Sequence, residues 1–125
     1  MKIEFLKSGS PECPWIRLYK FKASEAYELR RIALQLARGA YRVIPLQEGP
    51  TLSPIVSCEL TLRLGEEGQG VFETAPLKFS WVLSKSGWIW VAGLIRPFSR
   101  GQLSGFQWLS SKGGIQILLS PDGQW

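Results

Sequence analysis

The stretch Leu77-Lys-Phe-Ser-Trp-Val-Leu-Ser-Lys-Ser-Gly-Trp-Ile-Trp-Val-Ala-Gly-Leu-Ile-Arg-Pro-Phe98 decides the fold. It holds three of the six tryptophans and the densest run of apolar residues. In its first part, apolar residues alternate with polar ones, a pattern typical of a half-buried strand. The apolar positions are Leu77, Phe79, Trp81 and Leu83, and the polar positions are Lys78, Ser80 and Ser84. We therefore expect a strand from Leu77 that contributes to the core.

The second part, residues 88–95, fits two structures. As a strand, it would have to be buried on both faces, because all eight residues are apolar or glycine. As a helix, it would place Trp88, Val91, Ala92 and Ile95 on one face, with Ser86 as a cap and Pro97 near the end. Gly93 disfavours the helix by up to about 1 kcal/mol relative to alanine. We expect a second helix near 87–96, because a strand buried on both faces is unusual in a small antiparallel sheet.

Length and composition indicate one globular domain, residues 1–125. Apolar residues make up 45% and charged residues 20% of the chain, which excludes disordered, collagenous and coiled-coil classes. No apolar run reaches the about 18 residues that a membrane span needs. The segment Met1–Lys7 lacks the apolar core of a secretory signal. We expect a cytoplasmic protein without a membrane partner.

Periodicity predicts the other elements. The most regular is a helix over 24–38, with Ser24 as its N-cap and apolar residues at three- and four-residue spacing. Alternating patterns predict strands over 2–6, 15–21, 41–46, 55–64 and 115–119, and residues 71–72 could pair briefly. Residues 106–109 form an element of undefined type, and no internal repeat is visible in the sequence. The predicted class is α+β, with a mostly antiparallel sheet of about five to seven strands, one long helix (24–38) and a second helix near 87–96.

The positive charge is unevenly distributed along the sequence. Residues 1–42 contain nine Lys and Arg against four Glu, whereas residues 43–125 contain six residues of each sign. Apart from Arg30-Arg31, the N-terminal cations are spaced singly, and no run of five or more occurs. A solvated surface explains most of them, although a basic segment can also mark an anionic partner.

Groups with catalytic chemistry are scarce in the sequence. There is no histidine, so the usual catalytic triads and imidazole zinc sites are excluded, and no C-x-x-C pair or phosphate-binding loop occurs. Cys58 is expected to be a buried apolar residue, whereas Cys13 lies in a loop-forming segment with no histidine to activate it. Glu66 and Glu67 are adjacent in a glycine-rich turn. No catalytic residue, metal ligand or cofactor is predicted, and a small enzyme with a Cys or carboxylate site is the second alternative function.

The first candidate binding surface lies on the strand near residue 15. There Ile16 and Leu18 point to the core, while Trp15, Arg17 and Tyr19 share the opposite face. That face is either an exposed aromatic and basic surface or one covered by a neighbouring loop. Single-stranded nucleic-acid binders combine such cations with aromatic platforms for the bases. A nucleic-acid-binding domain is therefore the first alternative function.

The second candidate surface combines Arg96, Phe98 and Arg100 with Trp108. Arginine and aromatic residues are enriched at the centres of protein–protein interfaces. Because catalytic groups are scarce, we expect a non-enzymatic binding or accessory protein that acts as a protein–protein interaction module. The sequence identifies neither the protein partner nor the oligomeric state.

Three segments, Cys58–Gly65, Val91–Phe98 and Ile115–Trp125, resemble small bacterial proteins. This resemblance implies a bacterial source, and it assigns no family, activity or functional residue.

Overall fold

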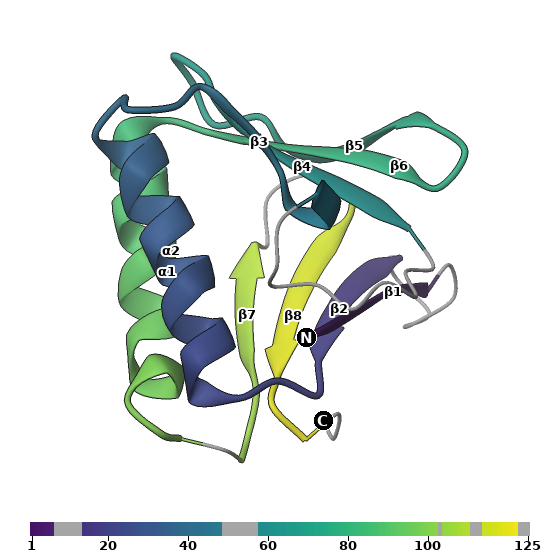
Figure 1. Ribbon diagram of the computed structural model, residues 1–125. Helices are drawn as coiled ribbons and strands as arrows, with labels where there is room; N and C mark the ends of the chain where they lie inside the picture. Colours follow the sequence, from purple (N-terminus) through teal and green to yellow (C-terminus); the bar gives the residue numbers. More distant parts are fainter. Residues whose placement is uncertain (7–13, 49–57, 103, 111–113, 123–125) are drawn as a thin grey trace.

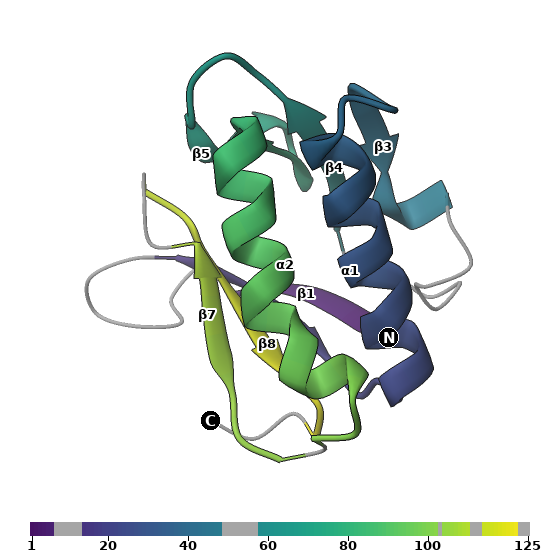
Figure 2. The same ribbon diagram turned by 90° about the vertical axis from the view of Figure 1, so that its left-hand side faces the viewer.

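The structure is a computed structural model that describes residues 1–6, 14–48, 58–102, 104–110 and 114–122. Two sheets meet at an angle, and two helices lie side by side along one flank of the sheet pair (Figure 1). Turned by 90°, the same arrangement shows the helices in front of the strands (Figure 2). The apolar core is therefore enclosed by three walls, namely the two sheets and the helix pair.

In chain order, the described residues place two strands before the first α-helix, four strands between the two α-helices, and two strands after the second. The first part of the chain contains β1 (Lys2–Leu6), β2 (Trp15–Tyr19), α1 (Ala23–Ala37), β3 (Val43–Pro45), a short 3-10 helix (Leu46–Glu48) and β4 (Glu59–Leu64). The second part contains β5 (Gly70–Ala75), β6 (Lys78–Leu83), α2 (Lys85–Ser99), β7 (Gln107–Ser110) and β8 (Gln116–Ser120).

Each sheet takes two strands from each part of the chain. Sheet A has the order β1-β2-β8-β7 and sheet B the order β3-β4-β6-β5. In both sheets the central pair is parallel, β2 with β8 and β4 with β6, and the outer pairs are antiparallel. Each part of the chain therefore contributes one antiparallel strand pair to each sheet. We call this arrangement the exchange of strand pairs.

This arrangement is an internal topological repeat that the sequence does not reveal. Both parts follow the order strand, strand, helix, strand, strand, and matching strands occupy matching places in the two sheets. The helices are both 15 residues long, and the fourth, seventh, eleventh and fourteenth residues of each are buried. The matched pairs are Ala26 and Trp88, Leu29 and Val91, Ala33 and Ile95, and Leu36 and Phe98. The two parts therefore share a plan, but their buried side chains differ in size.

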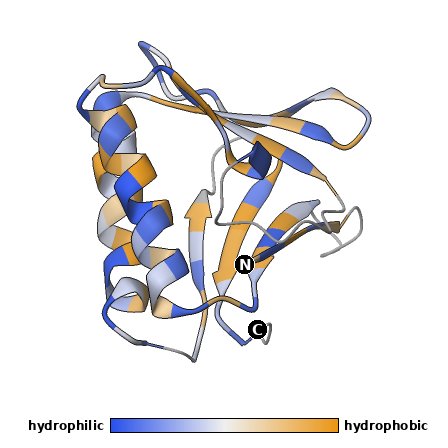
Figure 3. Ribbon diagram, viewed as in Figure 1, coloured by the Kyte–Doolittle hydropathy of each residue, from blue (hydrophilic) through white to orange (hydrophobic). Residues whose placement is uncertain are grey.

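The core joins residues from both sheets and both helices in one apolar cluster. Trp81 of β6 and Trp88 of α2 are fully buried, with ring centroids 4.8 Å apart, and Phe5 of β1 lies 4.6 Å from Phe79 of β6. Strand β8 is largely apolar along its length (Figure 3). Residues of the stretch 77–98 thus occupy the centre of the core.

The predicted α+β class is confirmed. Both predicted helices are present, and α2 settles the ambiguity at 88–95 in favour of a helix. The described residues contain eight strands, one more than the predicted range, and they form two sheets rather than one. Antiparallel pairing predominates, but both sheets are mixed. The undefined element at 106–109 is β7, and the brief pairing at 71–72 is the full strand β5.

The predicted helix ends need correction. The N-cap of α1 is Lys22 rather than Ser24, and Glu25 accepts a hydrogen bond from the Lys22 amide at 2.9 Å. The N-cap of α2 is Ser84 rather than Ser86, and its Oγ accepts from the Gly87 amide. Pro97 lies inside the last turn of α2 instead of ending it. Both N-caps occupy extended backbone before the helix, as expected of residues that bond its first free amides.

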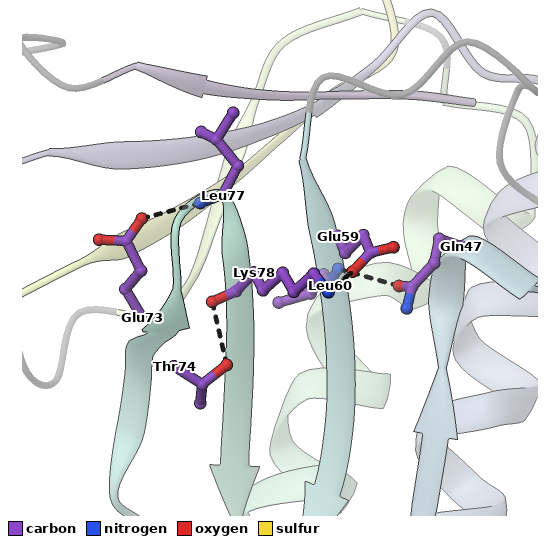
Figure 4. Close-up of polar contacts among 7 residues, drawn as sticks. All are labelled: Gln47, Glu59, Leu60, Glu73, Thr74, Leu77 and Lys78. Carbon is purple, nitrogen blue, oxygen red and sulfur yellow. Dashed lines mark hydrogen bonds and ion pairs between the residues drawn. The ribbon is translucent and has the colours of Figure 1, made fainter.

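The prediction for Leu77 is also corrected, because this residue does not begin the inward face of β6. It lies in the turn between β5 and β6 with a positive φ of 60°, and it is 49% exposed. Its amide donates to Glu73 Oε2 at 3.0 Å, and Thr74 Oγ1 donates to the Lys78 carbonyl (Figure 4). The turn, rather than burial, determines the position of this leucine.

The close-up in Figure 4 also shows how β4 is held between its neighbours. Gln47 Oε1 accepts a hydrogen bond from the Leu60 amide at 3.0 Å, which ties the 3-10 helix to β4. On the other side, Lys78 Nζ lies 3.9 Å from Glu59 Oε2, an exposed pair that contributes little to stability.

Replacing Leu77 with glycine is expected to raise the free energy of unfolding by up to about 1 kcal/mol. An L-residue with a side chain is strained in the left-handed region, and the exposed leucine contributes little burial there. Urea denaturation followed by circular dichroism measures the change. The matched control is Phe106→Gly, at an exposed residue whose φ is not positive, and it should destabilise the fold. Equal destabilisation by both variants would contradict this account of the turn.

Candidate functional site

On the predicted face of β2, the aromatic rings are already covered by other groups of the protein. It forms the outer surface of sheet A, and Trp15 there is only 8% exposed. The Arg17 guanidinium stacks 3.8 Å above the centre of the Tyr19 ring and donates to Glu4 Oε1 at 2.7 Å. Of the two predicted arrangements, covered or exposed, the covered one describes Trp15. This face is a packed structural surface on which neither ring is fully bare.

Trp108 joins the same face from β7. Its ring centroid lies 5.1 Å from that of Trp15, and its strand partner Leu118 is fully buried. Four predicted residues from opposite ends of the sequence, Trp15, Arg17, Tyr19 and Trp108, are thus brought together on sheet A. They form a small second apolar cluster on the outside of the sheet.

The other predicted residues lie on α2 and separate into core and surface. Phe98 is 2% exposed, and its ring packs against Phe21 with centroids 6.2 Å apart. It belongs to the core and presents no surface to a partner. Arg96 and Arg100 are exposed. Only these two of the predicted residues on α2 are accessible.

The most exposed apolar residues on α2 were not predicted as site residues. Ile89 and Trp90 are 58% and 56% exposed. Next to them on the outer side of the helix is Gly93, where an added Cβ would have no atom within 4 Å. The signal was present in the helical interpretation, because burial of Trp88 and Val91 on one face turns residues 89, 90 and 93 outward.

The two helices run antiparallel and form one continuous layer (Figure 2). Phe21 before α1 contacts Phe98 near the end of α2, and the Lys85 side chain at the start of α2 lies close to Gly39 after α1. We call α1 and α2 with their caps, residues 22–38 and 84–100, the helix layer. Exposed residues of both helices therefore share one face of the protein.

The helix layer carries a net charge equal to that of the whole chain. It contains seven Lys and Arg and two Glu, a net charge of five, whereas the remaining residues contain eight of each sign. The α2 segment has Lys85, Arg96 and Arg100 and no acidic residue. The folded protein is thus electrostatically asymmetric, with its excess positive charge on the helices.

Both glutamates of the helix layer are already engaged. Glu28 accepts from Arg31 at 2.8 Å, and this hydrogen bond and the Glu28 charge raise the pKa of Arg31. Glu25 accepts from the Met1 ammonium and the Lys22 amide. Burial alone would raise the pKa of Glu25, but these bonds and the nearby charges lower it. The carboxylates therefore leave most of the arginines uncompensated.

Two surface hollows border the helix layer. The first, the α1 hollow, has a volume of about 430 Å³ and is lined by Tyr27, Arg30, Arg31, Leu34, Gln35 and Arg38. The second has a volume of about 600 Å³, lies near the start of α2, and is lined by Arg42, Leu64, Gly65, Glu66, Ser84, Lys85 and Ser86. The first hollow is cationic and the second is of mixed charge.

Catalytic geometry is limited in the described residues. They contain no group of three or more potential metal ligands. Cys13 lies outside the described residues, whereas Cys58 is buried, and burial raises the pKa of its thiol to about 12. Since the thiolate is the nucleophile, Cys58 is an inert apolar residue at neutral pH.

We expect Cys58 to be protected from thiol reagents in the folded protein. In a Cys13→Ser variant, which leaves Cys58 as the single thiol, reaction with a disulfide reagent at pH 8 should be slow until urea unfolds the chain. Burial raises the pKa of the Cys58 thiol from 9.0 to about 12. The contribution of this thiol to the free energy of unfolding should therefore fall as the pH rises from 9.0 to about 12. Rapid reaction of the native variant would contradict the burial of this thiol.

No match to this chain is found among family models, curated proteins or solved structures.

Proposed function

We propose that the protein is a non-enzymatic binding or accessory protein of a bacterial cytoplasm that recognises another protein through the helix layer. The main support is the exposure of Trp90 and Ile89 on the same helix as Arg96 and Arg100. A tryptophan that is more than half exposed contributes little to folding. Trp and Arg are the residues that most often dominate the energy of protein–protein interfaces.

The charge of the helix layer indicates the chemistry of the partner. Its net charge of five would repel a cationic surface and attract an acidic one, which raises the association rate. Apolar anchors beside the cations would give such a complex its lifetime. The partner that fits best is therefore an acidic protein segment with apolar side chains that can cover Trp90 and Ile89.

The nucleic-acid alternative receives less support from the predicted residues. Base stacking needs free aromatic faces, but Arg17 covers the Tyr19 ring and Trp15 is buried. The enzyme alternative would need an accessible nucleophile or a convergent carboxylate pair. Among the described residues, Cys58 is buried, and Glu66 and Glu67 are exposed in the loop between β4 and β5.

No helix in the described ranges is long and apolar enough to cross a membrane.

The proposal is tested by photo-crosslinking in an extract of the native cell. A benzophenone amino acid is placed at position 90, and in a matched control at Phe72, which is exposed on β5 of sheet B. We expect one acidic protein to crosslink from position 90 and not from position 72. The crosslinked partner, once purified, should then bind the chain that lacks the benzophenone amino acid. Equal crosslinking from both positions would contradict the proposal, as would salt-sensitive binding of a mixed single-stranded oligonucleotide in place of a protein.

A further inference from the structure

We propose that the α1 hollow binds the phosphate group of a phosphorylated side chain in the partner protein. This inference rests on the proposed function, because it makes the hollow a specificity pocket of the helix layer. Its evidence is independent of Trp90 and lies in the shape, the free donors and the charge of the hollow.

The hollow is a continuous feature of the outer face of α1. Its lining residues recur at three- and four-residue spacing over three turns, which places them along one side of α1. Leu34 is half-buried and contributes apolar surface, while the arginines contribute the charged groups. A volume of about 430 Å³ is sufficient for one amino-acid side chain with its phosphate. The shape therefore suits a protruding side chain rather than a flat surface.

One donor in this group is left without an acceptor. Arg30 Nε is shielded from solvent, and it donates no hydrogen bond within the described part of the chain. A shielded donor that remains unpaired is unfavourable, so an anion that accepts from it would be stabilised there. Arg38 is exposed at the end of α1, and among the described residues it takes part in no ion pair.

The local charge matches a phosphate better than a carboxylate. Arg30, Arg31 and Arg38 contribute three positive charges, and among the described carboxylates only Glu28 offsets one of them, through Arg31. Two charges remain. A phosphate monoester carries about −1.5 to −2 at pH 7, whereas a carboxylate carries one negative charge. Planar guanidinium groups also pair with two phosphate oxygens at once, which favours arginine over lysine at such sites.

The position of the hollow fits a role in partner recognition. It lies on α1, whose neighbour α2 carries Trp90 and Ile89 on the same layer (Figure 2). A bound segment could therefore place a phosphorylated residue on α1 and apolar side chains on α2. Phosphorylation of the partner would then control binding through added charge.

Nuclear magnetic resonance of the arginine side chains tests this inference. The full chain is titrated with O-phosphoserine and, at equal ionic strength, with acetate, while the Nε–Hε signals are recorded. We expect saturable shifts at Arg30 and Arg38 with O-phosphoserine, and binding of acetate that is weaker by about tenfold. Arg42 and Arg63, which lie outside the hollow, should shift little. Equal effects of both anions, or equal shifts at all arginines, would overturn the proposal.

Variants distinguish a specific pocket from general attraction. Arg38→Gln should weaken O-phosphoserine binding by about tenfold, since it removes a charge-assisted pair. Lys78→Gln makes the same change in net charge on sheet B and should leave binding unchanged. Arg30→Lys keeps the charge but loses the planar fork, so it should also weaken binding. Saturable binding to vesicles containing phosphoinositides, without binding of O-phosphoserine, would assign the hollow to lipids and overturn the proposal.

The two proposals fail separately. If O-phosphoserine does not bind the hollow but the partner still crosslinks from position 90, the protein-binding function stands and the phosphate pocket does not. If O-phosphoserine binds at Arg30 and Arg38 but no protein crosslinks, the pocket stands and the proposed function does not.

Discussion

Replacing Trp90 with alanine should weaken binding of the partner captured from position 90 by at least about 30-fold, or about 2 kcal/mol. The ring is 56% exposed in the free protein, so a partner can remove a large apolar area from water by covering it. Because the ring lies on the outer side of α2, its loss should change the free energy of unfolding by less than about 0.5 kcal/mol. Isothermal titration calorimetry measures the binding, and urea denaturation measures the stability.

The control for this variant is Phe72→Ala. Phe72 is exposed on β5, away from the helix layer, and its loss should leave the affinity for the partner unchanged. Equal loss of affinity in both variants would show that binding depends on the fold in general. Full affinity of Trp90→Ala would remove Trp90 from the interface and, with it, the main support for the proposed function.

Cutting the chain between Glu67 and Gly68 should give two fragments that do not fold alone but assemble with each other. Every sheet contains two strands from each fragment, and the parallel pairs at the centres of both sheets join strands from different fragments. Alone, each fragment would expose half of the shared core. The cut itself falls in an exposed loop between β4 and β5, where it breaks no element.

The assembly should be a one-to-one complex of unlike fragments. The matched core positions combine small residues on α1, such as Ala26 and Ala33, with Trp88 and Ile95 on α2. Two copies of the same fragment would therefore leave cavities or clash. Because the interface is a domain core cut in half, we expect a dissociation constant below about 1 µM.

Circular dichroism of the mixed fragments tests this assembly. The helical signal of the mixture should exceed the sum of the separate fragments, and sedimentation should give the mass of one copy of each. A fragment that folds alone as a monomer would contradict the exchange of strand pairs between the two parts of the chain.

Local patterns in the sequence predicted the elements whose packing depends on their own residues. The helix over 24–38 followed from regular apolar spacing, and the structure places it at Ala23–Ala37. The inward faces of β4 and β6, including Leu60, Leu62, Phe79 and Trp81, followed from alternation. In these segments the same side chains that define the pattern also form the core.

Features that depend on distant residues or on the hydrogen bonds of a turn could not be predicted. The exchange of strand pairs between the two parts leaves no signal in either half, because matched positions carry residues of different size, such as Ala26 and Trp88. Leu77 continued the apolar alternation of β6, but the hairpin turn places it at positive φ. The backbone of Leu77 is held by a hydrogen bond to Glu73, which an alternating pattern does not reveal.

Only part of the candidate site was predicted, because the exposure of its residues depends on how the elements pack. Arg96 and Arg100 are exposed as predicted, but Phe98 fills the core, and Trp15 is covered. Trp90 was assigned to a generally apolar segment, and its exposure follows only once the helix is established. The hollow on α1 depends on three arginines. In the sequence, Arg38 stands as a single cation and Arg30-Arg31 as an isolated pair.

The central claim is that the helix layer is the face that binds a protein partner. The most direct test is the set of backbone amide signals of the labelled full chain that shift when the purified partner is added. The account predicts that the largest shifts lie in α1 and α2, near Tyr27, Arg38, Trp90 and Arg96. Shifts concentrated on the outer face of sheet A, around Trp15, Tyr19 and Trp108, with the helices unaffected, would contradict it.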